Sequence, residues 1–191
     1  MDLRKHLREK GFTSFEGGMY NQKNQIEFFN ELLKDKKKGL QIGFNSGDSA
    51  NYFLSINEGT LLSIDICSHQ YVLEAEKYIN DKYPNRHTLS IGDSTKVIPE
   101  LPDDIYDYIF IDGGHSVKVA TADIANCKRL ADENTLVIID DYVVKEEWIR
   151  KHNISVMKAV NNNPNFVRVG QKDFGIGRGV IYGYYKFDLK D

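Results

Sequence analysis

The chain has 191 residues, 41% of them hydrophobic and 28% charged, which is the composition of one globular domain with a buried core. Its 25 Lys and Arg residues against 28 Asp and Glu residues give a net charge of −3, so no positive field favours nucleic acid or an anionic membrane. No apolar run approaches the roughly 20 residues of a membrane helix. The two cysteines, Cys67 and Cys127, form no disulfide framework, and we expect a cytoplasmic protein.

Apolar segments alternate with segments of helical spacing along most of the chain. Ile26, Phe29 and Leu33 recur at helical spacing and predict a helix over residues 24–34. Strands are then predicted at residues 39–44, 60–66, 88–91, 106–111, 135–139, 166–169 and 180–187. The helices between the first five strands and after the fifth are predicted at residues 49–56, around 72–79, around 117–124 and through Trp148.

This alternation determines the expected fold. Strands joined by helical crossovers form a parallel sheet that is covered on both faces. The last two strands have no helix between them, so they are expected to form an antiparallel hairpin. The sequence therefore predicts an α/β fold with a doubly wound, mostly parallel seven-stranded sheet and an antiparallel C-terminal hairpin.

Glycines and polar residues follow each of the first five predicted strands. In such sheets, ligands bind at the carboxyl ends of the strands. The residues at these ends are Gly43-Phe44-Asn45-Ser46-Gly47, Asp65, Gly92-Asp93-Ser94, Asp112-Gly113-Gly114-His115 and Asp140-Asp141. Their recurrence at five strand ends predicts a ligand site at this edge.

Each of these segments also has a simpler interpretation. The first turn brings backbone N–H groups to a helix N-terminus, but Asn45 stands where a dinucleotide fingerprint needs its second glycine, and many ordinary turns contain glycine. Asp65, about twenty residues further on, fits an acceptor for two ribose hydroxyls or a plain turn carboxylate. Asp93 and Ser94 fit an adenine edge, and Asp93 equally fits a helix cap.

The ordered motifs LQIGFNSGDSA, SIDI, IGDS, FIDGGHS and VIIDDY, between Gly39 and Tyr142, resemble those of class I S-adenosylmethionine (SAM)-dependent methyltransferases. They are most similar to the branch of macrocin-type sugar O-methyltransferases and cephalosporin hydroxylase-like proteins. The resemblance implies one methyltransferase domain over residues 1–191, with an N-terminal helical segment at 1–37 and a Rossmann-like core at 38–191. One position departs from the family, which usually has an acid where this chain has Gln41.

The resemblance also implies which residues bind the cofactor. They are Gly43, Phe44, Asn45, Gly47 and Ser49 beside the methionine part of SAM, Asp65 and Ile66 beside ribose and adenine, Asp93 and Ser94 beside the adenine amino edge, and Asp112. The amide of Gln41 replaces the acid that would anchor the ammonium group of the cofactor.

A metal site is expected at Asp112, Asp140 and Asp141, whose oxygen ligands suit Mg²⁺, or else Ca²⁺ or Mn²⁺. The sugar methyltransferases carry the same D-x-x-H and D-D pairing as a metal site, which implies that Asp112 and His115 are catalytic, with His115 as general base. Neighbouring strand residues point in opposite directions, so the Asp pair reaches one cation only if the strand ends at Asp140. The alternatives are a metal-free turn for the two acids and a helix cap for His115.

Two effects oppose each other at His115. The helix N-terminus that follows it lowers the pKa of the imidazole, and the neighbouring carboxylates raise it. A bound cation would cancel much of the pull of the carboxylates. We therefore expect the metal-bound protein to hold His115 neutral near pH 7.

We expect a SAM-dependent, divalent-metal-dependent O-methyltransferase that acts on a hydroxyl of a small molecule, namely a sugar or glycan unit. Its acceptor pocket is expected from residues 15–20, 142–148 and 174–179, and a homo-oligomer is left open. A nicotinamide-dependent oxidoreductase on a related sheet is one alternative, although the missing glycine at position 45 and the acids after the fifth strand disfavour it. A non-catalytic SAM-binding protein is the other.

Overall fold

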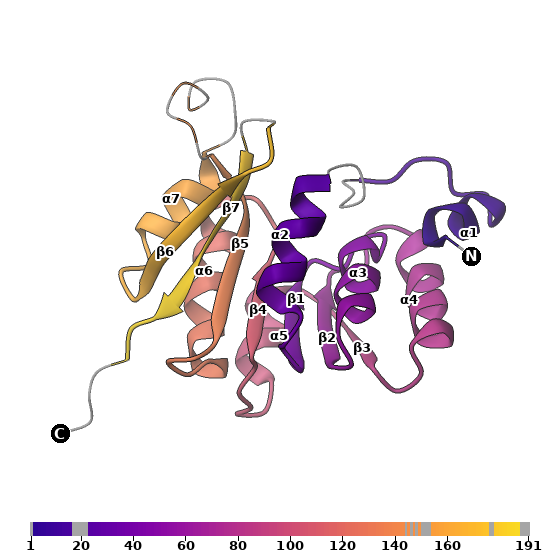
Figure 1. Ribbon diagram of the computed structural model, residues 1–191, viewed down its shortest axis with the longest axis horizontal. Coiled ribbons are helices and arrows are strands. Elements are labelled where there is room, and N and C mark those ends of the chain that lie inside the picture. The colour runs from indigo at the N-terminus through magenta and orange to yellow at the C-terminus, as the bar shows by residue number, and fades with distance from the viewer. Residues whose placement is uncertain are drawn as a thin grey trace. The chain divides into compact units, whose positions relative to one another are not determined.

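The computed structural model describes residues 2–16, 23–143, 145, 147, 149, 154–175 and 178–187 (Figure 1). Within these residues, seven strands form a mixed sheet in the order β3-β2-β1-β4-β5-β7-β6. The strands are β1 (Lys38–Ile42), β2 (Thr60–Asp65), β3 (His87–Ile91), β4 (Tyr108–Ile111), β5 (Leu136–Val143), β6 (Phe166–Asp173) and β7 (Arg178–Tyr185). The predicted α/β class, strand number and C-terminal hairpin are confirmed.

The described helices are α1 (Leu3–Glu9), α2 (Lys23–Leu33), α3 (Asp48–Ile56), α4 (Tyr71–Lys82), α5 (Ser94–Glu100), α6 (Val117–Cys127), the short 3-10 helix η2 (Lys128–Leu130) and α7 (Ser155–Asn161). None of them is long and apolar enough to cross a membrane. The chain divides into two compact units, Met1–Asp93 and Ser94–Asp191, here called the first and second units.

In the first unit, β1, β2 and β3 are parallel neighbours, with β2 in the middle. Leu40 and Ile42 of β1 and Leu61 and Ile64 of β2 are buried, as expected for a parallel sheet with helices on its faces. Helix α2 packs against α3, where the rings of Phe29 and Phe53 are 5.5 Å apart. Because β1 and β2 are parallel, the turns that lead from them into α3 and α4 begin at the same edge of the sheet.

Helix α1 packs against α4 in the same unit (Figure 1). Its Leu3 and Leu7 are four residues apart on one helical face, and both are fully buried. The Asp2 carboxylate caps the helix by accepting a hydrogen bond from the backbone N–H of Arg4. Two basic residues contact Glu74 of α4: His6 of α1, with Nε2 2.8 Å from Glu74 Oε1, and Lys10, directly after α1, with Nζ 3.5 Å from the same oxygen.

In the second unit, β4 pairs in parallel with β5, and β7 runs antiparallel to both β5 and β6. Every residue of β4 is buried. Helix α6 packs against α5 and α7, and the Tyr185 hydroxyl of β7 donates to the Ile124 carbonyl of α6. The hairpin is therefore joined to the helical layer of this unit.

The fifth strand differs from its prediction. It was expected to end at Ile139, but β5 continues through Asp140 and Asp141 to Val143. The register against β7 shifts between Ile139 and Tyr142, which is a β-bulge, and Asp141 has a φ of 56°. Pairing with β7 keeps these residues in the strand, and no local pattern indicated it.

The helix predicted after the fifth strand, through Trp148, falls on a segment in which residues 144, 146, 148 and 150–153 lie outside the described residues. Helix α7 was not predicted.

Candidate functional site

The turn between β1 and α3 contains three residues with left-handed backbone conformation. They are Gly43, Asn45 and Gly47, with φ values of 91°, 51° and 77°. Asparagine adopts this conformation more readily than most side-chain-bearing residues, which explains how Asn45 replaces a glycine of the fingerprint. A Cβ atom on Gly47 would lie 2.9 Å from the Phe44 ring. The Gly43–Gly47 segment, here called the cofactor turn, therefore depends on these residue types.

Asp65, at the end of β2, holds the cofactor turn through its carboxylate. Oδ2 accepts the backbone N–H groups of Phe44 at 2.9 Å and Asn45 at 2.8 Å, and Oδ1 accepts the N–H of Cys67 at 2.7 Å. A carboxylate has about four acceptor directions, so roughly one is left for a ligand. The predicted pair of hydrogen bonds to two ribose hydroxyls remains a prediction, and the turn role of Asp65 is visible in the structure.

Gln41, at the position where the family usually has an acid, is fully buried. Its amide Nε2 donates to the Gly43 carbonyl at 2.8 Å and to Ser49 Oγ at 2.6 Å. Its Oε1 accepts from the Ser63 hydroxyl at 3.0 Å. The Gln41 amide therefore links the Gly43 end of the cofactor turn to Ser49 in α3.

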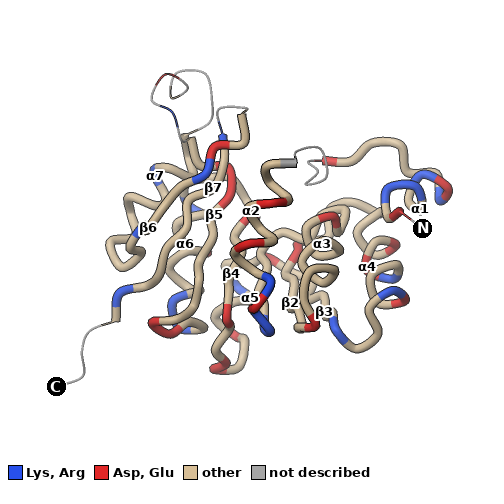
Figure 2. The backbone as a smooth tube through the Cα atoms, viewed as in Figure 1, with Lys and Arg blue, Asp and Glu red and all other residues tan. Residues whose placement is uncertain are grey.

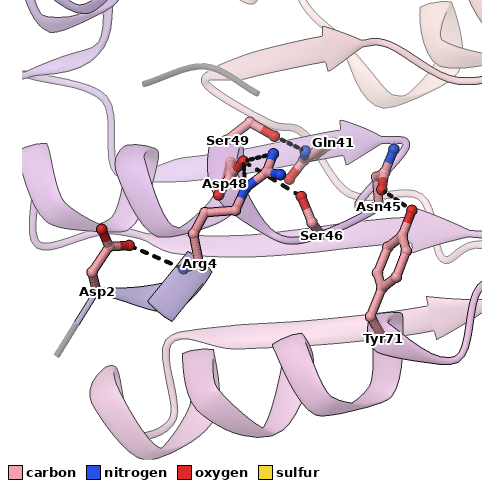
Figure 3. A network of polar contacts seen from close by, with 8 residues as sticks. All are labelled: Asp2, Arg4, Gln41, Asn45, Ser46, Asp48, Ser49 and Tyr71. Carbon is pink, nitrogen blue, oxygen red and sulfur yellow. Dashed lines mark hydrogen bonds and ion pairs between the residues drawn. The ribbon is translucent and has the colours of Figure 1, made fainter. Parts of the chain in front are cut away.

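Side chains from two helices hold the two sides of the turn (Figure 3). Tyr71 of α4 donates its hydroxyl to Asn45 Oδ1 at 2.8 Å. Arg4 of α1 donates from Nε to Asp48 Oδ2 at 2.6 Å and adds a second contact from its terminal nitrogen. Ser46 Oγ donates to the same carboxylate oxygen at 3.4 Å. Sequence reasoning missed Arg4 and Tyr71, because no motif connects α1 or α4 to this turn. Asp48 lies within the first motif, but no role was assigned to it.

Two isoleucines at the carboxyl ends of β2 and β3 are exposed. Ile66, directly after Asp65, has 66% of its surface exposed, and Ile91, the partner of Asp65 in the β2–β3 register, has 55% exposed. Large apolar side chains beside a polar turn are suitable contacts for a flat aromatic ring. Asp93 is the last residue of the first unit, and Ser94 begins α5 of the second.

The second unit brings together Asp112, His115 and Asp141, whose potential ligand atoms all lie within 4.8 Å of one another. His115 Nε2 is 2.7 Å from Asp141 Oδ2 and 3.7 Å from Asp112 Oδ1. Asp112 follows β4, His115 precedes the Ser116 cap of α6, and Asp141 lies in the bulge of β5. This group of three residues is called the acid–histidine cluster below.

Arg178, the first residue of β7, was not predicted to join this group. Its guanidinium is 3.0 Å from Asp141 Oδ1, so Asp141 contacts one basic group with each oxygen. Figure 2 shows acidic and basic segments next to each other at this end of β5 and β7. Arg178 could be found only from the placement of β7 beside β5, which the sequence does not specify.

Asp140 does not belong to the acid–histidine cluster among the described residues. Its Oδ1 accepts the backbone N–H of Asp141 at 2.8 Å. Loss of hydration, followed by the charges of Asp112 and Asp141, raises its pKa well above the usual value. The metal set predicted from Asp112, Asp140 and Asp141 remains a prediction. The three potential ligand groups that the structure brings together among the described residues are those of Asp112, His115 and Asp141.

The carboxylates dominate the protonation of His115. Asp112 and then Asp141 raise the pKa of His115 to about 10, which outweighs the opposing effect of burial. Loss of hydration raises the pKa of Asp112, while its interaction with His115 opposes the rise. His115 is therefore an imidazolium at pH 7 in the metal-free protein. The neutral state that we predicted applies only when a cation neutralises the carboxylates.

Part of the expected acceptor pocket lies outside the described residues, namely 17–20, 144, 146, 148, 176 and 177. Its remaining residues are described, among them Phe15 and Phe174. Phe15 lies against the Tyr71 ring at 5.4 Å and under the Arg4 guanidinium at 4.7 Å. Phe174 is buried. The pocket itself remains a prediction.

Residues 40–142 match the model of a family described as Methyltransferase domain, which covers more than half of the chain. No curated protein matches the chain. Among solved structures, it is similar to an O-methyltransferase from Bacillus cereus in complex with SAH, with 16% identity over 95% of this chain and 90% of that chain and a TM-score of 0.69.

Two other solved structures are similar to the chain over most of its length. TomG, an O-methyltransferase from Streptomyces achromogenes in complex with SAM, is 14% identical over 96% of this chain and 88% of that chain, with a TM-score of 0.69. The SAH-bound methyltransferase PaMTH1 from Podospora anserina is 14% identical over 97% and 88%, with a TM-score of 0.70. At these identities, the similarity establishes the fold.

Proposed function

The chain belongs to the methyltransferase domain family that it matches, and on this premise we propose that it is a SAM-dependent O-methyltransferase. The observation that carries the proposal is the cofactor turn, with its left-handed residues Gly43, Asn45 and Gly47 fixed by the Asp65 carboxylate. Such a turn presents backbone atoms closely to a ligand at the start of a helix. Similar folds with bound SAM or SAH support the choice of cofactor.

In this proposal, the cofactor binds along the carboxyl ends of β1 and β2. The methionine part lies along the cofactor turn and Ser49, and a ribose hydroxyl takes the remaining acceptor direction of Asp65. The exposed side chain of Ile66 packs on the adenine ring, and Ile91 adds to the same apolar surface. Asp93 and Ser94 are proposed to bind the adenine amino edge.

We further propose that the acceptor is a hydroxyl of a small molecule, a sugar or glycan unit. In the reaction, the hydroxyl oxygen attacks the methyl carbon of the sulfonium, the carbon–sulfur bond breaks, and the hydroxyl proton leaves. The products are a methyl ether and SAH. His115 is proposed to take the proton, which requires that it first be neutral.

Asp112, Asp140 and Asp141 would hold a divalent cation, because carboxylate oxygens suit Mg²⁺ or Mn²⁺. His115, whose Nε2 is 2.7 Å from Asp141 Oδ2, would stay uncoordinated and act as the base. A cation there would polarise the acceptor hydroxyl and lower its pKa. It would also replace the positive charges that now neutralise Asp141. We also propose that the protein is cytoplasmic and that an N-terminal helical segment at residues 1–37 precedes a Rossmann-like core at residues 38–191.

Calorimetric titration of the full chain with SAH and, separately, with NAD⁺ tests the cofactor. We expect SAH to bind and NAD⁺ not to bind; the reverse result would replace the proposal with the oxidoreductase alternative. Incubation of the enzyme with methyl-labelled SAM and a panel of sugars and nucleotide sugars, with and without Mg²⁺, tests the reaction by mass spectrometry. SAH binding without transfer to any hydroxyl compound would instead favour a non-catalytic SAM-binding protein.

A further inference from the structure

Four side chains of the first unit form a continuous chain of hydrogen bonds beneath the cofactor turn. His87, at the start of β3, lies with Nε2 3.0 Å from Ser63 Oγ of β2. The Ser63 hydroxyl donates a hydrogen bond to Gln41 Oε1 of β1, and Gln41 Nε2 donates one to Ser49 Oγ in the first turn of α3. His87, Ser63 and Gln41 are buried, and Ser49 is half-buried. These four residues are called the relay below.

The direction of every hydrogen bond in the relay follows from one backbone carbonyl. The Gly43 carbonyl oxygen can only accept, so the Gln41 group 2.8 Å away must be the amide NH₂. The same NH₂ then donates to Ser49, and the opposite side of the amide presents Oε1 to Ser63. Because Oε1 can only accept, the Ser63 hydroxyl must donate to it.

The direction at Ser63 fixes the tautomer of His87. Since the Ser63 hydrogen is used on Gln41, Ser63 Oγ accepts from His87, and the imidazole proton lies on Nε2. His87 Nδ1 is buried and has no hydrogen-bond partner among the described residues, so a second proton would have no acceptor there. Burial accordingly lowers the pKa of His87 to about 4. The relay is neutral and runs in one direction from His87 to Ser49.

We propose that His87 and Ser63 are positioning residues for the cofactor turn and act through Gln41. The proposal rests on the proposed binding of SAM at this turn. Gln41 joins the start of the turn at Gly43 to Ser49, two residues after its end, so both sides are held by one amide. His87 and Ser63 keep that amide in the single orientation in which both bonds form.

The hydrogen bond from Gln41 also determines whether the Ser49 hydroxyl can donate a hydrogen bond to a ligand. Ser49 Oγ accepts from Gln41, which is its only polar contact in the described part of the chain. The Ser49 hydrogen therefore points away from Gln41 and is available to a ligand atom that accepts. An acid at position 41 would place a carboxylate oxygen against the Gly43 carbonyl, so this relay requires an amide.

The test compares two ligands that differ only in the part expected at this turn. SAH carries the amino-acid moiety, and 5′-methylthioadenosine lacks it. We expect Ser63→Ala to weaken SAH binding roughly tenfold, the effect of about one buried hydrogen bond, and to leave 5′-methylthioadenosine binding within twofold. The KM for SAM should rise by a similar factor, with kcat unchanged at saturating SAM. Ser63→Thr, which keeps the hydroxyl, should restore most of the SAH affinity.

Thr135→Val is the matched control, because it also removes a buried hydroxyl, one that donates to the Tyr106 carbonyl in the second unit. It should lower the midpoint of urea unfolding and leave the affinity ratio of the two ligands unchanged. His87→Phe keeps an aromatic ring beside Phe44, which stacks on His87 at 5.0 Å, and removes the Nε2 donor. His87→Phe should lower SAH affinity roughly threefold. It takes the place of Ser63→Ala as the test variant if Ser63→Ala does not fold.

A folded Ser63→Ala or His87→Phe variant with the wild-type ratio of SAH to 5′-methylthioadenosine affinity would overturn the proposal. Equal weakening of both ligands would also overturn it, since that pattern indicates general destabilisation. Failure of the wild-type protein to bind SAH would refute the proposed function instead, which keeps the two failures distinct.

Discussion

Arg4 of α1 donates to the carboxylate of Asp48, in the first turn of α3, across 44 residues of sequence. The Asp48 side chain is 6% exposed and the Arg4 side chain 19%, so the ion pair is largely removed from water. Asp48 Oδ1 has no hydrogen-bond partner among the described residues, which leaves Arg4 and Ser46 as the groups that stabilise the carboxylate. A helix that precedes the family-matched segment thereby supports the turn proposed to bind the cofactor.

We expect Arg4→Met to destabilise the protein by about 3 kcal/mol, because it leaves a buried carboxylate without its charge partner. SAH affinity should fall as well, since Asp48 lies directly after the cofactor turn. Urea unfolding and calorimetric titration measure the two effects. Lys5→Met on the same helix is the control, because the exposed Lys5–Glu9 pair, at 4.0 Å, should contribute almost nothing. Equal behaviour of the two variants would contradict the prediction.

The burial of His87 should make the protein sensitive to acid. The pKa of His87 is about 4 in the folded chain, below its ordinary value of 6.5, so the unfolded chain binds the proton first as pH falls. The stability that depends on neutral His87 is complete above pH 6.5 and is lost between pH 6.5 and 4, by on the order of 3 kcal/mol in total.

Urea unfolding of the wild-type protein and His87→Phe across pH 4 to 7 isolates this effect from other titrating groups. The difference in unfolding free energy between the two proteins should shift in favour of the variant as pH falls. A difference that does not change with pH would show that His87 is not held neutral.

Arg178 should compete with a cation for Asp141. Its guanidinium contacts Asp141 Oδ1 at 3.0 Å, so a bound metal must displace it or bind beside a positive charge. We expect Arg178→Gln to increase Mn²⁺ affinity roughly tenfold, as measured by electron paramagnetic resonance titration. Arg168→Gln, which removes an exposed arginine bonded to Gln171 on β6, should leave the affinity unchanged. No Mn²⁺ binding to either protein would exclude this metal from the cluster.

The protonation of His115 should depend on the metal. Without a cation, its pKa of about 10 makes it an imidazolium at pH 7, and its ion pairs stabilise the fold fully below pH 6.5. That stabilisation declines as pH rises from 6.5 toward 10. Addition of Mg²⁺ should lower the pKa, which titration of the imidazole by nuclear magnetic resonance detects. An unchanged titration in saturating Mg²⁺ would contradict metal binding at this cluster.

If His115 is the general base, His115→Gln should reduce turnover at least roughly a hundredfold at saturating SAM and Mg²⁺. The acid limb of the pH–rate profile should disappear with it, because that limb reports protonation of the base. His69→Gln is the control, since His69 stacks on Tyr71 in the first unit and does not belong to the cluster. Wild-type turnover in His115→Gln would limit its role to the ion pairs.

The sequence by itself determined the number of strands, the order of most elements and the residues at the strand ends. The apolar runs that became β1, β2 and β4 lie within two residues of their predicted bounds, because burial on both faces of a parallel sheet leaves a continuous apolar signal. The glycines of the cofactor turn were equally visible, since left-handed backbone restricts residue type locally. The motif order from Gly39 to Tyr142 identified the family that residues 40–142 match.

Only the tertiary structure decided what the site residues contact. Asp65 accepts three backbone N–H groups, Gln41 lies buried beneath the turn, and Arg4 reaches Asp48. Asp140 and Asp141 lie in a bulged strand rather than a turn, because β7 pairs beside β5. Each of these facts depends on which distant segments become neighbours. Periodicity and spacing encode only local conformation, so they predict the residues at a site but not their partners.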